Sequence, residues 1–168
     1  MGRQRPPTRQ VLIGGGIVIA VLVGLCVTSL RRAGDFRGYL EVGDILLRGG
    51  HPYTEATPGI NTWPPVFGLF CVPLALLADV SLYLARGLWL ALNLAALVWS
   101  LKLIIGLVWR RPLALDPRRR GIPLASVAVV APLVLAYPGV TGNFFHLQIN
   151  ILVFAVVLTG LACQAKGR

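Results

Sequence analysis

Asp35 is the residue of this sequence best placed for acid–base chemistry. It lies where a long apolar segment ends and an amphipathic stretch begins, and Arg31, Arg32 and Arg37 flank it. Positive neighbours keep a carboxylate ionised, so Asp35 could take a proton from an attacking hydroxyl as a general base. A second interpretation stays open, in which Asp35 only serves as the N-cap residue of the helix that follows.

Four other polar residues border the apolar segments, where they could contact a substrate. Arg86 either makes hydrogen bonds between helices or helps to hold a lipid phosphate. His146 has either a structural role or a contact with substrate. Gln148 and Asn150 begin the last apolar segment, where they either cap a helix or contact a sugar. The sequence has no metal-ligand spacing such as Cys-x-x-Cys or His-Glu-x-x-His.

The stretch from Asp35 to Tyr53 is expected to hold Asp35 at a membrane interface. Written as an α-helix, it separates apolar from charged residues. The apolar face has Phe36, Tyr39, Leu40, Gly43, Leu46 and Leu47, and the charged face has Arg37, Glu41, Asp44 and Arg48. Opposite charges four residues apart would support such a helix. Gly49, Gly50 and Pro52 should then end it.

The composition places the chain among integral membrane proteins. Of its 168 residues, 56% are hydrophobic and 13% are charged, and the mean hydropathy is +0.75. The length allows a single transmembrane domain over residues 1–168, with spans of about 20 residues each. The net charge of +10 comes from basic residues scattered between apolar segments, which does not fit nucleic-acid binding. Cys26, Cys71 and Cys163 are interpreted as small core residues.

We expect an all-α fold of about four transmembrane helices, with both ends of the chain in the cytoplasm. The expected spans are Val11–Leu30, Leu82–Leu107, roughly Ile122–Tyr137 and Leu147–Cys163. Val66–Ala78 is too short to cross a bilayer upright and is expected to be interfacial. The loop Trp109–Gly121 holds five arginines, so the positive-inside rule places it in the cytoplasm. Residues 31–65 then form an extracytoplasmic loop with one or two interfacial helices, and residues 138–147 form a second outer loop.

The first expected span carries a small residue at every fourth position along most of its length. These residues are Gly16, Ala20, Gly24 and Thr28. Such a stripe lies on one face of a helix and suits the close approach of a second helix. The span is expected to be an uncleaved anchor, because its apolar part is longer than that of a signal peptide and ends without a small-residue cleavage site.

Several short motifs, taken together, resemble one family of membrane enzymes. The motifs are Asp35-Phe36, the Gly-Gly-x-Pro-Tyr run from Gly49 to Tyr53, Pro64-Pro65, and the Gln-x-Asn of Gln148 and Asn150. In this order they resemble glycosyltransferase family 87, the polyprenol-phosphate-mannose-dependent mannosyltransferases of the GT-C superfamily. The resemblance runs from about Asp35 to the end of the chain. Because members of this family usually have ten or more spans, it implies the N-terminal part of a larger GT-C fold.

The resemblance implies transfer of a mannosyl or other hexosyl residue from a polyprenyl-phosphate donor to a glycolipid or glycan. The reaction would take place at the outer face of the cell membrane, with inversion, with Asp35 as the catalytic base, and without a cofactor or metal. The residues expected to bind substrate or lipid are Arg37, Tyr39, Tyr53, Arg86, His146, Gln148 and Asn150. The competing hypothesis is a small non-catalytic membrane protein that binds lipid or assembles with a partner.

Overall fold

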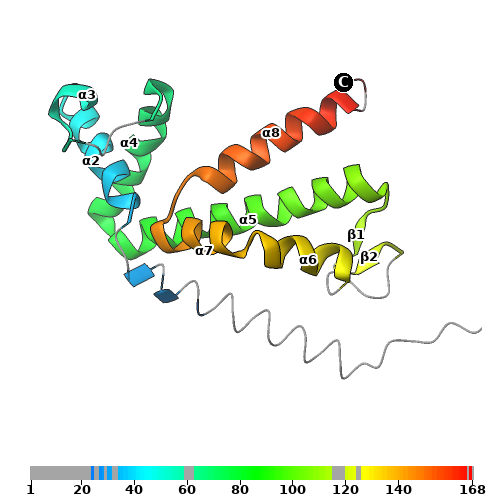
Figure 1. The fold of residues 1–168 in the computed structure, drawn as a ribbon. Helices are drawn as coiled ribbons and strands as arrows, with labels where there is room; N and C mark the ends of the chain where they lie inside the picture. The colour runs from blue at the N-terminus through cyan, green and yellow to red at the C-terminus, as the bar shows by residue number, and fades with distance from the viewer. Residues whose placement is uncertain are drawn as a thin grey trace, which may run out of the picture.

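The computed structural model is mostly helical (Figure 1) and describes residues 24, 27, 28, 30, 31, 34–58, 63–114, 120–123, 126–165 and 167. Its helices are α2 (Phe36–Leu47), α3 (Pro52–Glu55), α4 (Pro65–Val80), α5 (Leu82–Trp109), α6 (Val127–Leu135), α7 (Tyr137–His146) and α8 (Asn150–Ala165). Two strands of two residues each, β1 (Leu113–Ala114) and β2 (Ile122–Pro123), pair in parallel between α5 and α6. The expectation of a mainly helical fold is therefore confirmed, and the short strand pair is an addition to it.

The long helix α5 packs mainly against α8 and α4 and also contacts α6 (Figure 1). It begins at Ser81, whose hydroxyl accepts a hydrogen bond from the Leu84 N–H (3.3 Å), and it ends where Arg110 adopts a left-handed conformation. Its 28 residues span about 42 Å. Within the part of the chain that the structure describes, α5 is long and apolar enough to cross a membrane by itself, as the sequence predicted for Leu82–Leu107.

The segment after β2 differs from its prediction. We expected a span that ends at Tyr137 and an outer loop after it, but α7 continues the helical path to His146, with a bend of 63° between α6 and α7. The Tyr-Pro-Gly sequence looked like a loop, yet Pro138 lies in the first turn of α7, where its missing N–H costs no hydrogen bond. Together, α6 and α7 are apolar and long enough for one bent span.

The last expected span is fully described, and the first only in part. The helix α8 begins at Asn150 instead of Leu147, because Leu147 has a left-handed backbone (φ 53°) that no α-helix can contain. Both α8 and α4 are shorter apolar helices of 16 residues. Of Val11–Leu30, only positions 24, 27, 28 and 30 are among the described residues, so the first expected span lies largely outside them.

The helices α2 and α4 form an antiparallel hairpin that projects from the α5–α8 body (Figure 1). Gly43 makes this packing possible, because a Cβ atom there would overlap the backbone carbonyl of Cys71 and lie 2.7 Å from the Ala75 Cβ. On the predicted apolar face of α2, Phe36, Tyr39 and Gly43 are buried, and Leu40 and Leu46 are half-buried. Leu47 is the exception, with 44% of its surface exposed, and Ile45 is buried in its place.

Candidate functional site

The first turn of α2, which carries Asp35 at its start, is fixed to the corner between α7 and α8. The Asp35 N–H donates a hydrogen bond to the His146 carbonyl (2.9 Å). Gly34 lies directly against the same backbone, since a Cβ atom at Gly34 would be 2.5 Å from the His146 Cα. Gly34 also has a positive φ of 43°, which a residue with a side chain adopts at a cost. The fold thus brings the candidate base next to a candidate ligand from the other end of the chain.

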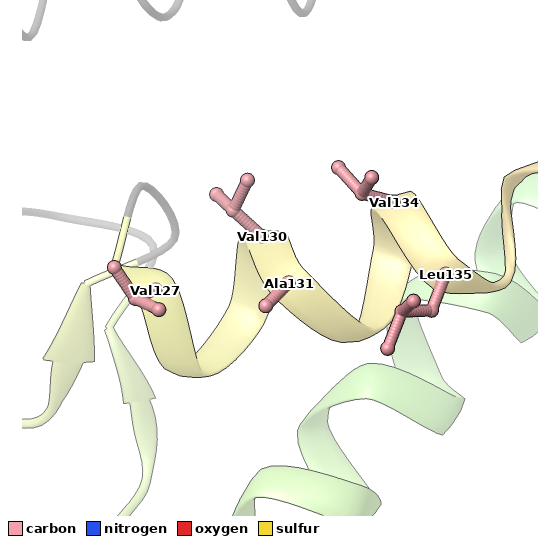
Figure 2. Close-up of a pocket in the computed structure, with 5 residues that line it drawn as sticks. All are labelled: Val127, Val130, Ala131, Val134 and Leu135. Atoms are coloured by element: carbon pink, nitrogen blue, oxygen red, sulfur yellow. The ribbon is translucent and has the colours of Figure 1, made fainter.

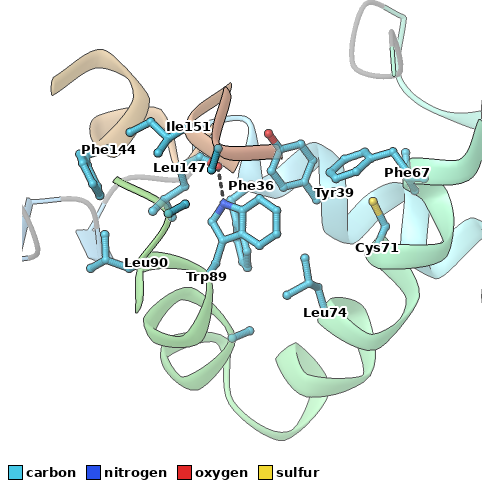
Figure 3. Close-up of a cluster of buried hydrophobic side chains, with 14 residues drawn as sticks. Phe36, Tyr39, Phe67, Cys71, Leu74, Trp89, Leu90, Phe144, Leu147 and Ile151 are labelled. Atoms are coloured by element: carbon cyan, nitrogen blue, oxygen red, sulfur yellow. Dashed lines mark hydrogen bonds between the residues drawn. The ribbon is translucent and has the colours of Figure 1, made fainter. Parts of the chain in front are cut away.

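Two buried aromatic side chains, Trp89 and Tyr39, make hydrogen bonds to the backbone of this α7–α8 corner. The Trp89 indole N–H donates to the Leu147 carbonyl (2.7 Å), as Figure 3 shows. The Ile149 N–H donates to the Tyr39 hydroxyl oxygen (3.1 Å), which joins positions 110 residues apart. Tyr39 and Trp89 are in edge contact, with ring centroids 5.3 Å apart, and both are buried. Tyr39 therefore connects α2, α5 and the corner in one core.

Asn143 on α7 completes the corner through its backbone and its side chain. Its carbonyl accepts from the Gln148 N–H (2.9 Å), and its side-chain oxygen accepts from the Ile151 N–H (3.3 Å). Its amide nitrogen donates to the side-chain oxygen of Asn93 on α5 (3.1 Å). Asn93 and Asn143 are both buried. Buried polar groups of this kind fix one arrangement of helices, because any shift leaves them without partners.

Asn143→Ala is expected to destabilise the protein by about 1–3 kcal/mol, because Asn93 and Ile151 would each lose a hydrogen-bond partner in a buried place. The measurement is thermal unfolding of the detergent-solubilised protein, followed by tryptophan fluorescence. Asn150→Ala is the matched control: Asn150 is exposed, and among the described residues its side chain donates only to the Gln148 side chain (3.0 Å). Equal melting temperatures for Asn143→Ala and the wild type would contradict a structural role for the asparagine pair.

Asp35 occupies the N-cap position of α2 without using its carboxylate there. Its backbone is helical (φ −67°, ψ −20°), and among the described residues its side chain makes no capping hydrogen bond. The interpretation of Asp35 as a helix cap therefore has no support from the geometry. Burial raises the pKa of the Tyr39 hydroxyl, and the negative charge of Asp35 raises it further. Tyr39 is thus a protonated hydroxyl within the electrostatic reach of the Asp35 carboxylate.

Arg86 brings a positive charge to the same end of the bundle. Its Nη1 donates to the Leu30 carbonyl (2.8 Å), just before the chain reaches Asp35. Its Nε is buried and has no hydrogen-bond partner among the described residues. Asn93 and Ser100, which follow Arg86 at intervals of seven on α5, are buried. Arg86 and Asn93 make hydrogen bonds to other segments, whereas the buried Ser100 Oγ has no partner among the described residues.

Of the remaining residues predicted to bind substrate, most lie at or near this corner, and Tyr53 does not. His146 and Asn150 are exposed and Gln148 is half-buried, so all three can meet a molecule at the corner. Arg37 is exposed on the first turn of α2. Tyr53 is not brought to Asp35: it lies on α3, beyond the far end of α2 (Figure 1), and its hydroxyl donates to the Trp63 carbonyl (2.7 Å). The 12 residues of α2 separate the two sites by about 18 Å.

Charged side chains of α2 bind the segment that follows this helix. The Glu41 carboxylate accepts from the Thr57 N–H (2.7 Å) and the Thr57 hydroxyl (2.8 Å). These two bonds lower the pKa of Glu41, and the charge of Arg37 contributes less. Arg48 donates through Nε to the backbone carbonyl of Asp44 (3.2 Å). Glu41 and Arg48 thus bind Thr57 and a backbone carbonyl. These contacts outweigh the attraction between side chains of opposite charge that the four-residue spacing predicted.

Three residues that shape the site were not singled out from the sequence as site residues. Trp89 and Asn143 lie in apolar stretches, where a single indole or amide could equally face lipid headgroups. Gly34, directly before Asp35, was one of 19 glycines. The sequence offered no separate signal for Asn143, because residues 138–147 were expected to form a loop, in which an amide needs no buried partner.

A shallow hollow on the surface lies away from this corner. It follows one side of α6 and is lined by Val127, Val130, Ala131, Val134 and Leu135 (Figure 2). All five side chains are apolar, so the hollow has no group that could take part in acid–base chemistry. Among the residues that the structure describes, no three His, Cys, Asp or Glu side chains lie close enough to hold a metal ion.

Comparison with known proteins gives one match. The sequence model of glycosyltransferase family 87 matches residues 61–168. This region contains α4 to α8, and with them Arg86, His146, Gln148 and Asn150, whereas Asp35 precedes it. No curated protein and no solved structure matched the chain.

Proposed function

Because this chain belongs to glycosyltransferase family 87, we propose that it transfers a mannosyl residue from a polyprenyl-phosphate donor to a glycolipid or glycan acceptor. The family implies a glycosyltransferase, and hence a sugar donor and an acceptor. The donor and the outer face of the cell membrane are our proposal. Nucleotide sugars are cytoplasmic, so transfer on the outer face needs a sugar carried on a lipid. The observation that carries the proposal is the attachment of Asp35 to the α7–α8 corner through the His146 carbonyl.

In the proposed reaction, Asp35 acts as the general base. Its carboxylate takes the proton of the acceptor hydroxyl as that oxygen attacks the anomeric carbon of the donor. The new glycosidic bond forms while the bond from the anomeric carbon to the phosphate oxygen breaks, and the configuration inverts. One carboxylate is sufficient, because polyprenyl phosphate leaves already ionised and needs no general acid.

Arg86 is proposed to stabilise the leaving phosphate. A fixed positive charge near a group that gains negative charge lowers the barrier to its departure. The Arg86 Nε has no hydrogen-bond partner among the described residues, and Nη1 attaches the guanidinium to the Leu30 carbonyl, so its positive charge stays at this end of the bundle. We therefore assign no step to a metal. Gln148, Asn150 and His146 are proposed to contact the sugar, and Arg37 to contact acceptor or lipid headgroup.

Transfer itself is the direct test. Membranes that contain the chain are supplied with radiolabelled polyprenyl-phosphate mannose, and label in extracted glycolipid and glycan is measured. The same lipid with glucose tests the choice of sugar, and membranes without the chain give the background. Label above background with the mannose lipid supports the proposal. Label at background level with either lipid would favour the non-catalytic role in lipid binding or assembly.

Members of family 87 are membrane proteins, and α5 is long and apolar enough to cross a bilayer. We propose four spans, formed by residues 11–30, α5, the bent pair α6–α7, and α8. Residues 31–65 and α4 would then lie on the outer side, and both chain ends in the cytoplasm. The five arginines between Trp109 and Gly121 support this orientation through the positive-inside rule.

This topology predicts which side of the membrane can be labelled. A cysteine that replaces His51 should react with an impermeant maleimide added to intact cells, and a cysteine that replaces Asp116 should react only after permeabilisation. The same variants in permeabilised cells provide the control for reactivity. Labelling of the Asp116 position alone in intact cells would reverse the topology and place Asp35 on the cytoplasmic side.

A further inference from the structure

The outer side of α6 and α7 is apolar and open in the part of the chain that the structure describes. Val127 and Leu135 have 80% and 83% of their surface exposed. Val130 and Val134 point to the same side of α6 (Figure 2). Further along, Gly139 and Gly142 have no heavy atom within 4 Å of the place where a Cβ would lie. This valine-rich surface, which includes the shallow hollow along α6, continues into a surface of α7 that another backbone can approach closely. We call the bent apolar surface of α6 and α7 the ridge.

The chain that precedes α2 is fixed at the end of this ridge. Arg86 binds the Leu30 carbonyl, and the His146 carbonyl at the C-terminus of α7 binds the Asp35 N–H. Gly34 lies against the His146 backbone so closely that no side chain fits. A helix that ends at Leu30 would therefore have its C-terminal end beside the last turn of α7.

The segment before this attachment point matches the ridge in length and chemistry. Residues 11–30 contain no charged side chain and as a helix cover about 30 Å. The pair α6–α7, residues 127–146, has the same number of residues and is similarly apolar. Both segments end at one point, so a helix over residues 11–30 that crosses the same hydrocarbon layer would run parallel to α6–α7.

From this geometry, we propose that the open side of α6–α7 is the docking surface for residues 11–30 of the same chain. The face with Gly16, Ala20 and Gly24 is the one that meets α6. Gly24 has nothing within 4 Å of its Cβ position. Branched side chains on one helix and small residues on the other allow close contact, which is the main source of helix association within lipid. The docked segment would hold Asp35 from its N-terminal side.

Disulfide trapping tests the docking. Counted from Leu30 and from His146, Ala20 and Val134 lie about 15 Å and 18 Å along their helices, so they are at similar depth. A chain with A20C and V134C is prepared with Cys26 and Cys163 replaced by alanine, while the buried Cys71 is kept. A protease site is inserted after Asp116, between the two cysteines. After oxidation in membranes and proteolysis, the two fragments are expected to stay linked until a reductant is added.

The matched control is V18C with V134C, because Val18 lies on the opposite side of a helix from Ala20. This control is expected to give separate fragments. A second pair, G16C with V130C, repeats the test one turn deeper and covers the case that the first variant is poorly expressed. A linked product of twice the chain mass before proteolysis would show that a second copy covers the ridge. Separate fragments from both pairs would show that lipid covers it, and either outcome overturns the proposal. None of these results depends on whether the protein is catalytically active.

Discussion

Asp35→Asn is expected to lower mannosyl transfer by about 10²-fold or more, the usual loss when a positioned general base is removed. The amide has nearly the same shape but cannot accept the proton of the acceptor hydroxyl. The fold should be retained, because the bond to the His146 carbonyl comes from the Asp35 backbone N–H. The measurement is the initial rate of label transfer from polyprenyl-phosphate mannose in membranes with equal amounts of each variant.

Asp44→Asn is the matched control for this substitution. Asp44 is an exposed carboxylate on the same helix, and Arg48 contacts its backbone carbonyl through Nε. The loss of an exposed charge of this kind costs less than about 1 kcal/mol, so most activity should remain. Transfer by Asp35→Asn at the wild-type rate would remove Asp35 from the mechanism and leave the role in lipid binding or assembly.

Arg86→Gln is expected to reduce transfer by about 10²-fold, the scale for loss of one group that stabilises developing negative charge. Glutamine keeps an N–H donor for the Leu30 carbonyl but has no charge to offer the leaving phosphate. Arg86→Lys keeps the charge and should recover part of the lost rate. Comparison of the two variants therefore separates the electrostatic role of Arg86 from its hydrogen bond to Leu30.

Equal losses in Arg86→Gln and Arg86→Lys would mean that the guanidinium geometry matters and the charge alone does not. Transfer by Arg86→Gln at the wild-type rate would leave Arg86 with a structural role only. Trp89 lies one turn away on α5 and binds the Leu147 carbonyl, so its fluorescence in each purified variant reports whether the corner is intact.

Apolar length and charge, read from the sequence alone, determined the main helices. The 28 residues of α5 have no break between Ser81 and Arg110, and the small residue Gly43 and its apolar neighbours gave α2 a surface for packing. Such features are local, because periodicity and capping act over a few residues. The sequence also placed Asp35 at the start of an amphipathic helix.

The tertiary structure alone decided what lies next to Asp35. Sequence analysis predicted residues 138–147 as a loop, but α7 and the left-handed Leu147 turn this segment back so that the His146 carbonyl meets the Asp35 N–H. The Tyr39 contact to Ile149 and the Asn93–Asn143 pair close the same corner. Contacts between residues so far apart depend on how whole helices pack. Short-range patterns do not specify that packing, since a buried donor accepts any partner that the fold brings within reach.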